Sequence, residues 1–352
     1  MPSMSNATIH RILKMVLRDI YPEAIDRNIA MLTEGLPNFR PEQSITLAMS
    51  PATPTLTRTE NSWTYNGVLG SSHWHVDFPA CGGNRQSPIN IDLSKVIVNQ
   101  SLSSFDLTDL HKIEGIEMKM ENVLGHTVEV DVSGASQYVF GGGLQGRYKV
   151  EQFHFHWGSI DARGSEHSIN SRLHPGEMHI VLFSVNYPDI KTALTKQDGV
   201  AVLGFFFKIG EHNTHFDYIL SHFVNISHSG KTQELEAFSI RTLLPPWPKT
   251  FYRYVGSLTT PPCSETVVWT LFKEEIEISE QQLEKFRHIK RNKLGEIDED
   301  LTDDFRPLQR LYGRKITTNN LAGLTESVTG HACQCATHLL LIVFAFCLLQ
   351  MI

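Results

Sequence analysis

The sequence predicts a protein of the mainly β class (α+β), built on one large and mostly antiparallel sheet. Short apolar runs recur between turn residues through the middle of the chain, and such runs are typical of strands. Helical periodicity is scarce in the same region. The runs that predict strands span residues 116–120, 127–132, 149–157, 179–185, 201–209 and 266–272.

Residues 1–60 form an N-terminal arm that precedes the predicted strands. Apolar residues at helical spacing over 9–20 allow a short amphipathic helix, but basic residues interrupt the apolar runs. A secretory signal needs about 7–15 apolar residues in sequence, so this segment is not one. Pro, Ser and Thr accumulate over 37–60, which is typical of a flexible linker. We therefore expect the whole arm to be poorly ordered.

The strand that contains Gln152 carries two histidines in alternation. Because alternate residues of a strand point to opposite faces, Gln152, His154 and His156 share one face and three aromatic residues share the other. Residues 177–183 also predict a strand, and antiparallel pairing of the two would bring His179 close to the first two histidines. Three neutral imidazoles without a fourth protein ligand describe a catalytic zinc site with an open position.

A short helix is predicted after the last of these strands. Ser279 is a typical N-cap residue, and the acidic Glu280 follows it in the first turn. We expect this helix to end near Ile289. Beyond it, residues 292–330 become polar and charged.

Composition and charge limit the classes of function. The chain has 352 residues, of which 41% are hydrophobic and 20% are charged, as in soluble globular proteins. A net charge of -7 argues against nucleic acid as a partner. Only two of the 5 cysteines, Cys81 and Cys263, precede the C-terminal tail. Counting alone allows either two free thiols or one disulfide that closes a long loop.

Four blocks of sequence resemble the α-class carbonic anhydrases, and together they cover roughly residues 63–316. The resemblance implies a domain at 61–316 with a twisted, mostly antiparallel sheet, short surface helices and a zinc ion at the base of a conical cleft. The implied activity is the zinc-dependent, reversible hydration of carbon dioxide to bicarbonate and a proton. The blocks lie at residues 84–91, 152–167, 177–179 and 256–263. Residues 305–309 also resemble the family's final strand region.

The resemblance implies roles for individual residues around the zinc. Thr259 would accept the proton of the attacking hydroxide in a hydrogen bond and donate its own hydroxyl proton to Glu166. The implied zinc ligands are His154, His156 and His179, and the expected hydrogen-bonding partners of those ligands are Gln152 and Glu177. The positions expected to bind the substrate beside the metal are Val181, Val202, Leu258, Thr259, Thr260 and Trp269.

Proton export is implied for His126, which matches the family's shuttle position at the rim of the cleft. A histidine with an ordinary pKa near 6.5 suits this task, although the same residue could be a simple surface turn. Tyr65 matches a residue of the family's solvent network. At Leu124 and Glu129 the chain departs from the polar pattern of the most familiar members, which affects the expected efficiency of the shuttle.

Several features favour the extracellular face of the plasma membrane. Cys81 and Cys263 match the single disulfide of secreted and membrane-attached family members, so the resemblance selects the disulfide. Asn99 and Asn225 begin glycosylation sequons. The N-terminus shows no signal peptide, and we interpret this as an incomplete or alternative start.

The C-terminal end predicts attachment to a membrane. Residues 317–338 form a linker with small residues near 327–332, and the apolar tail over 339–352 is shorter than the ~20 residues that span a bilayer as a helix. This pattern matches a signal for a glycosylphosphatidylinositol (GPI) anchor, with a retained or unprocessed hydrophobic tail as the alternative. We expect a monomer whose small-molecule substrate is carbon dioxide or bicarbonate.

The alternative function is a non-catalytic carbonic anhydrase-like binding module at the cell surface. Proteins of that kind typically lose one or more of the metal histidines, whereas this chain retains His154, His156 and His179. A cupin-like metal site would need a glutamate at a fixed spacing after His156, and the chain lacks it. We therefore expect a zinc lyase.

Overall fold

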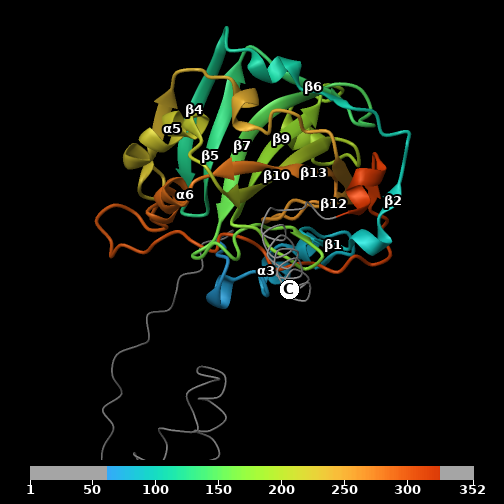
Figure 1. Ribbon diagram of the computed structural model, residues 1–352. Helices are drawn as coiled ribbons and strands as arrows, with labels where there is room; N and C mark the ends of the chain where they lie inside the picture. The colour runs from blue at the N-terminus through green and yellow to red at the C-terminus, as the bar shows by residue number, and fades with distance from the viewer. Residues whose placement is uncertain (1–61, 326–352) are drawn as a thin grey trace, which may run out of the picture. The chain divides into compact units, whose positions relative to one another are not determined.

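The computed structural model of the chain describes residues 62–325. The N-terminal arm over 1–60, the expected lipid-attachment region near 327–332 and the apolar tail over 339–352 lie outside these residues. The described part is dominated by strands with a few short helices (Figure 1), which confirms the predicted mainly β class. No helix within 62–325 has both the length and the apolar character that crossing a membrane requires.

Strands make up most of the regular structure of the described residues, and the helices between them are short. The strands are β1 (Asn90–Ile91), β2 (Ile97–Val98), β3 (Phe105–Asp106), β4 (Ile116–Val123), β5 (Thr127–Gly134), β6 (Tyr138–Gly141), β7 (Tyr148–Trp157), β8 (Ser168–Ile169), β9 (Gly176–Ser184), β10 (Val200–Ile209), β11 (Thr232–Leu235), β12 (Phe251–Gly256), β13 (Val267–Ile278) and β14 (Thr317–Thr318). The α-helices are α3 (Trp74–Asp77), α4 (Ile190–Ala193), α5 (Thr214–Ser221) and α6 (Glu280–Arg287). The 3-10 helices are η1 (Gly67–Leu69), η2 (Pro79–Gly82), η3 (Leu93–Lys95), η4 (Thr108–His111), η5 (Phe223–Ile226), η6 (Ile240–Leu243) and η7 (Leu321–Leu324).

One 12-stranded sheet carries the fold. Ten of its strands follow the order β11-β4-β5-β7-β9-β10-β13-β12-β14-β2, and the other two lie off this path, with β6 paired to β7 and β3 paired to β6. Most neighbouring strands are antiparallel, as expected, but β10 with β13 and β14 with β2 are parallel, so the sheet is mixed. Parallel strands need a long crossover connection, and the chain from β10 to β13 contains α5, η5, β11, η6 and β12. Helices α5 and α6 lie next to each other near β4 and β5 (Figure 1).

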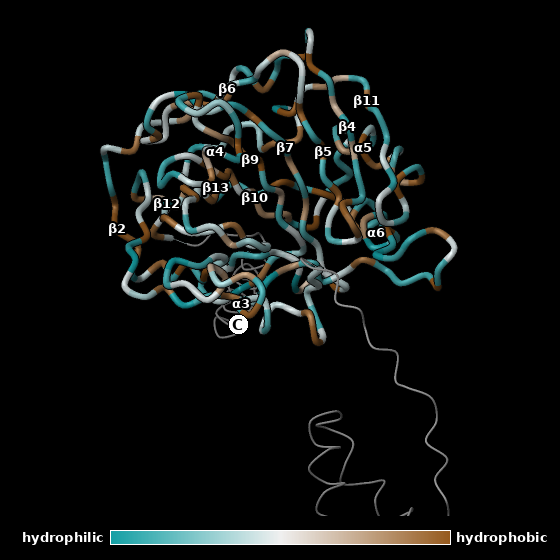
Figure 2. Tube along the Cα trace, turned by 180° about the vertical axis from the view of Figure 1, so that it is seen from behind, coloured by the Kyte–Doolittle hydropathy of each residue, from teal (hydrophilic) through white to brown (hydrophobic). Residues whose placement is uncertain are grey.

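Burial follows the alternation of side chains along the strands. Hydrophilic and hydrophobic residues alternate along β4 and β5 in Figure 2, and alternate residues of β4 are buried. On β7 the aromatic side chains Phe153, Phe155 and Trp157 are fully buried in the main core. Every residue of the central strand β9 is buried, and its alternate side chains belong to two different core clusters, Ile180 to one and Val181 to the other.

The predicted helix after the last long strand is confirmed with a shorter C-terminus. Ser279 is the N-cap of α6, and its hydroxyl accepts from the backbone N–H of Gln282. The Gln282 side chain accepts in return from the backbone N–H of Ser279, which completes a capping box. The helix ends at Arg287, ahead of Ile289.

Two features near the C-terminal end of the domain differ from the expectation. Residues 305–309, which resemble the family's final strand region, form no strand. The sheet instead continues past residue 316 into the segment assigned to a linker, where β14 pairs with β12 and β2. Two residues are too short a run to show strand periodicity, so sequence patterning could not reveal β14.

A disulfide joins Cys81 to Cys263, which decides between the two arrangements that counting had left open. The sequence separation is 182 residues, and the two Cα atoms lie 4.9 Å apart. Both cysteines are buried in a small cluster with Tyr65 and Trp74. The backbone carbonyl of Cys81 also accepts a hydrogen bond from the guanidinium of Arg306. The bond therefore ties the N-terminal segment of the domain to the loop that precedes β13.

We predict that replacing both cysteines, Cys81→Ala with Cys263→Ala, lowers the free energy of unfolding by roughly 3–5 kcal/mol, since the bond restricts the unfolded chain over a long loop. Urea unfolding of the oxidised wild-type domain and of the double variant measures the difference. The reduced wild-type protein is the matched control and should resemble the variant. Equal unfolding free energies for the oxidised wild type and the variant would contradict the prediction.

Candidate metal centre

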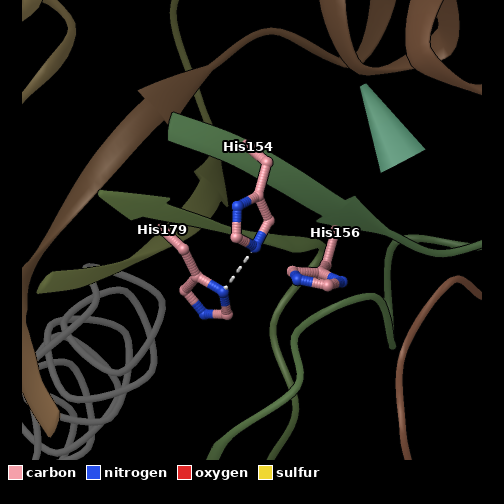
Figure 3. Close-up of side chains that lie close together, drawn as sticks. All are labelled: His154, His156 and His179. Atoms are coloured by element: carbon pink, nitrogen blue, oxygen red, sulfur yellow. Dashed lines mark hydrogen bonds between the residues drawn. The ribbon is translucent and has the colours of Figure 1, made fainter. Parts of the chain in front are cut away.

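Three histidines from two neighbouring strands point toward one another (Figure 3). His154 and His156 lie on β7 and His179 lies on β9, with His154 directly opposite His179 in the antiparallel register. The centroids of the three rings are 4.8–5.1 Å apart. The structure thus brings together the three side chains that the sequence selected, and they form a group able to hold a metal ion.

Each imidazole has one nitrogen that donates to a protein oxygen. Nδ1 of His154 bonds Oε1 of Gln152 at 2.9 Å, and Nδ1 of His156 bonds the backbone carbonyl of Asp304 at 2.7 Å. Nε2 of His179 bonds Oε1 of Glu177 at 2.7 Å. Because these oxygens can only accept, each of these nitrogens carries the proton of its neutral ring.

The other nitrogen of each ring therefore holds a lone pair. Nε2 of His154 and Nδ1 of His179 are 3.2 Å apart (Figure 3), and Nε2 of His156 is buried without a hydrogen-bond partner among the described residues. Lone pairs that face one another in a buried place need a cation between them. Three neutral imidazoles with no carboxylate in the set fit zinc with an open coordination position.

The electrostatic surroundings of the rings agree with this fit. Burial, and then the neighbouring rings, hold the pKa of His154 well below 6.5, so this ring is neutral at physiological pH. Burial also lowers the pKa of His156, but the charges of Glu166 and Asp304 outweigh it and raise the net value. Positive charge beside His156 is therefore favoured, and a metal dication would supply it.

Glu177 is a buried carboxylate with all of its acceptor positions used. Oε2 accepts from the backbone N–H groups of Glu166 and His167, and Oε1 accepts from the rings of His167 and His179. Burial alone would raise the pKa of Glu177, but the two rings and these hydrogen bonds hold it well below 4.5. Although His167, Glu177 and His179 also cluster closely enough for a metal, this complete set of donors marks Glu177 as an orienting group.

A glycine on the neighbouring strand β10 leaves room for the Glu177 carboxylate beside His179. Gly204 lies opposite His179 in the register of β9 and β10. A Cβ atom at this position would lie 2.5 Å from the side chain of Leu271 and 3.2 Å from Oε1 of Glu177. A larger residue would therefore press on the carboxylate that orients His179.

Thr259 and Glu166 are both buried close to the histidines. Oε1 of Glu166 accepts from the backbone N–H of Arg306 at 3.0 Å, while Oε2 is buried, has no hydrogen-bond partner within 62–325 and lies 3.5 Å from Nε2 of His156. Thr259 lines the same cavity as the three histidines. No hydrogen bond joins Thr259 to Glu166 in the described part, so the expected relay stays a prediction, and Oε2 is the oxygen available for it.

A cavity of about 250 Å³ opens above the histidines. Val181 on β9, Val202 on β10 and Trp269 on β13 lie side by side in the register of the sheet and form an apolar wall. All three are nearly buried. The structure places every expected substrate-binding residue on this cavity: Val181, Val202, Leu258, Thr259, Thr260 and Trp269.

His126 lies at another part of the same cavity, on the tight turn between β4 and β5. Leu124 and Gly125 adopt positive φ angles of 50° and 73°, and a Cβ atom at Gly125 would collide with the backbone of Arg291. The ring stacks on Trp63 with centroids 3.7 Å apart, and Nε2 donates to the carbonyl of Trp63 at 2.9 Å. Nδ1 is therefore the nitrogen that can accept a proton.

The surroundings of His126 change its pKa. Burial lowers the pKa of this ring below 6.5, the hydrogen bond to Trp63 opposes the shift, and the charge of Arg291 adds to it. The neutral form of His126 therefore persists to lower pH than in an ordinary histidine.

Tyr65 also lines the cavity, and its buried hydroxyl has no protein partner in the described part. Burial, followed by the charges of Asp304 and Glu166, raises its pKa well above 10. The phenol consequently stays neutral and can both donate and accept, as a member of a solvent network must.

Sequence reasoning missed two residues that shape the centre. Asp304 supplies the carbonyl that orients His156, and its Oδ1 accepts from the backbone N–H of Trp157. Burial is the main cause that raises the pKa of Asp304 to about 8. Every residue has a backbone carbonyl, so the residue types of the sequence could not indicate that the carbonyl of Asp304 contacts His156.

Glu129 is the second missed residue, noted in the sequence only as a departure from a polar pattern. It lines the cavity, and its Oε2 accepts from Nε2 of Gln152 at 2.7 Å. Burial, and then the charges of Asp131 and Glu121, raise the pKa of Glu129 to about 7. An unusual acidic residue at a cleft-lining position was the available signal.

The fold and the site define a class of protein: a β-sheet domain with an open three-histidine metal centre beside an apolar wall. The model of the eukaryotic-type carbonic anhydrase family matches residues 69–320, which is well over half of the chain. The chain belongs to the carbonic anhydrase family.

Two relatives illustrate the similarity. Carbonic anhydrase 6 of Bos taurus is 34% identical over 265 residues, which cover 74% of this chain and 81% of that protein. Carbonic anhydrase 12 of Homo sapiens is 36% identical over 225 residues, which cover 63% of this chain and 62% of that protein.

We predict that His154→Ala, His156→Ala and His179→Ala each weaken zinc binding by more than the roughly 100-fold that loss of an outer hydrogen-bonding partner can cost. Metal analysis after equilibrium dialysis against a zinc buffer measures the affinity. His215→Ala, at an exposed histidine of α5, is the matched control and should bind zinc as the wild type does. A histidine variant with unchanged affinity would remove that residue from the centre.

Proposed function

We propose that this protein catalyses the zinc-dependent, reversible hydration of carbon dioxide to bicarbonate and a proton. The observation that carries the proposal is the set of three imidazole nitrogens that converge from His154, His156 and His179 beside an apolar wall. Family membership supports the same reaction class.

His154, His156 and His179 would hold the zinc ion. When bound, zinc supplies a positive charge that lowers the pKa of a coordinated water, an effect for which carbonic anhydrase is itself the standard example. The partners Gln152 and Glu177 would keep their rings in the tautomers that leave the lone pairs free.

Thr259 and Glu166 would orient the nucleophile. Oε1 of Glu166 is already used by the backbone of Arg306, so Oε2 is left to accept the hydroxyl proton of Thr259. With its proton committed there, the Thr259 oxygen can only accept, and the nucleophile must then direct a lone pair away from Thr259. Carbon dioxide is apolar, and the wall formed by Val181, Val202 and Trp269 offers it a dry surface.

His126 would take the proton out of the cavity. Its Nδ1 is free to accept, because Nε2 is held by the carbonyl of Trp63. Tyr65 lines the same cavity as the metal centre and His126. Its neutral hydroxyl would donate and accept hydrogen bonds in the solvent between them.

The proposal extends to location at the extracellular face of the plasma membrane. The disulfide between Cys81 and Cys263 supports an oxidising compartment. Asn225 is exposed and Asn99 half-buried at the surface, so both sequon asparagines are accessible for glycosylation. Attachment through a lipid on the C-terminal region completes this part of the proposal.

Thr259→Ala tests the reaction. We expect the wild-type protein to hydrate carbon dioxide, and the variant to lose about 10- to 100-fold in kcat/KM while it retains one equivalent of zinc, because Thr259 orients the nucleophile without holding the metal. Stopped-flow hydration measured together with metal analysis gives both quantities.

Thr214→Ala, at an exposed threonine of α5 away from the cavity, is the control and should retain the wild-type activity. A wild-type protein that binds zinc but does not hydrate carbon dioxide would refute the proposal and favour a non-catalytic binding module. Loss of zinc in Thr259→Ala would show that this residue supports the metal instead.

His126→Ala should lower kcat by about 10-fold or more at low buffer concentration and leave kcat/KM for carbon dioxide unchanged, because proton export is separate from attack on the substrate. Imidazole buffer should restore kcat by carrying the proton. An unchanged kcat at low buffer would assign proton export to another path.

The lowered pKa of His126 gives this prediction a pH dependence. The ring accepts protons only while it is neutral, and it is neutral above its pKa. The His126-dependent part of kcat should therefore persist as pH falls through 6.5 and disappear only at lower pH. NMR titration of the ring in wild type, with His126→Ala to assign the signal, checks the midpoint.

A further inference from the structure

Glu129 lies on the strand next to the metal-binding strand. In the register of β5 and β7 it is directly opposite His154, and its side chain faces the cavity. Two acidic residues, Glu121 and Asp131, act on Glu129, and Lys119 forms ion pairs with both of them. The Glu129 side chain accepts a hydrogen bond from the Gln152 amide.

A continuous chain of hydrogen bonds leads from Glu129 to the metal centre. Nε2 of Gln152 donates to Oε2 of Glu129 at 2.7 Å, and Oε1 of the same amide accepts from Nδ1 of His154 at 2.9 Å. The nitrogen of the Gln152 amide therefore donates to Glu129, while its oxygen accepts from His154. An amide that faces a carboxylate must present its N–H₂ group, because a carboxylate has no proton to donate.

The orientation of this amide determines what His154 can do. With the oxygen of Gln152 toward the ring, Nδ1 must carry the proton, and Nε2 keeps its lone pair for the metal. With the amide reversed, the N–H₂ group would face Nδ1 and favour the tautomer that protonates Nε2, which cannot bind a metal. Without Glu129, the Gln152 amide would lose the acceptor that turns its N–H₂ group away from His154.

We propose that Glu129 is a positioning residue, which orients the Gln152 amide and through it selects the metal-binding tautomer of His154. This role rests on the proposed zinc centre and adds to it an outer link that acts through Gln152. A neutral Glu129 can serve in the same way, because its proton can be donated to the neighbouring Asp131 carboxylate while its carbonyl oxygen still accepts from the amide.

Zinc release into excess chelator, followed in the absence of turnover, is the measurement. Loss of a direct hydrogen-bonding partner of a ligating histidine typically costs about 10–100-fold in metal affinity. Glu129 is one hydrogen bond further from the histidine than such a partner. We therefore expect Glu129→Ala to release zinc on the order of 3- to 10-fold faster than wild type. Glu129→Gln should stay within about 2-fold, since its amide oxygen accepts the same bond.

Glu121→Ala is the matched control, because it removes a carboxylate from the position on β4 opposite Glu129 without touching Gln152. It should release zinc at the wild-type rate. The visible spectrum of the cobalt-substituted protein gives a second readout, in which Glu129→Ala should differ from wild type and Glu129→Gln should not. Thermal unfolding of the metal-free variants identifies any variant that fails to fold.

The decisive comparison uses Gln152→Ala. If Glu129 acts through Gln152, adding Glu129→Ala to Gln152→Ala should change zinc release by less than about 2-fold. A full effect of Glu129→Ala in that background, or an effect of Glu129→Gln as large as that of Glu129→Ala, would overturn the positioning role. A wild-type protein that binds no zinc would instead refute the proposed function, so the two failures are distinguishable.

Discussion

The register between β7 and β9 is the constraint on which the rest of the site depends. Side chains of a strand alternate with a period of two, so a slip of one residue would turn His179 to the opposite face from His154. The aromatic side chains on the other face of β7 oppose such a slip, because it would move Phe153 and Phe155 out of a fully buried core. Large apolar side chains each gain about 1.5–3 kcal/mol from burial, so the core holds the register that the metal centre needs.

A second constraint is the charge of Glu177, which is buried and must be fully satisfied. Its hydrogen bonds reach His167, whose Nε2 contacts the hydroxyl of Tyr254 at 2.6 Å. Tyr254 in turn contacts Ser87, and the hydroxyl of Ser87 accepts from the backbone N–H of Ser257. Ser257 begins the loop that carries Thr259, so one hydrogen-bonded network connects a ligating histidine to the residue proposed to orient the nucleophile.

Sequence alone could predict those parts of the molecule in which a side chain acts through its type and spacing. The alternation at Gln152, His154 and His156 predicted both the strand and the histidine face, and Ser279 predicted the start of α6. The carbonyl of Asp304 could not be predicted, because any residue supplies a carbonyl and its place depends on a tertiary contact. The strand β14 and the parallel pairing of β10 with β13 likewise arise from long-range assembly, which local patterns do not record.

The two ends of the large sheet have a consequence for solubility. Edge strands expose unpaired backbone groups that can recruit another chain, and here the edges are the short strands β11 and β2. Asn225 donates to Gln233 on β11, and Asn99 follows β2 directly, with its backbone N–H bonded to Thr318. Each sequon asparagine therefore stands beside one open edge. If the proposed glycosylation takes place, carbohydrate at these two positions would shield these two strands from pairing with another chain.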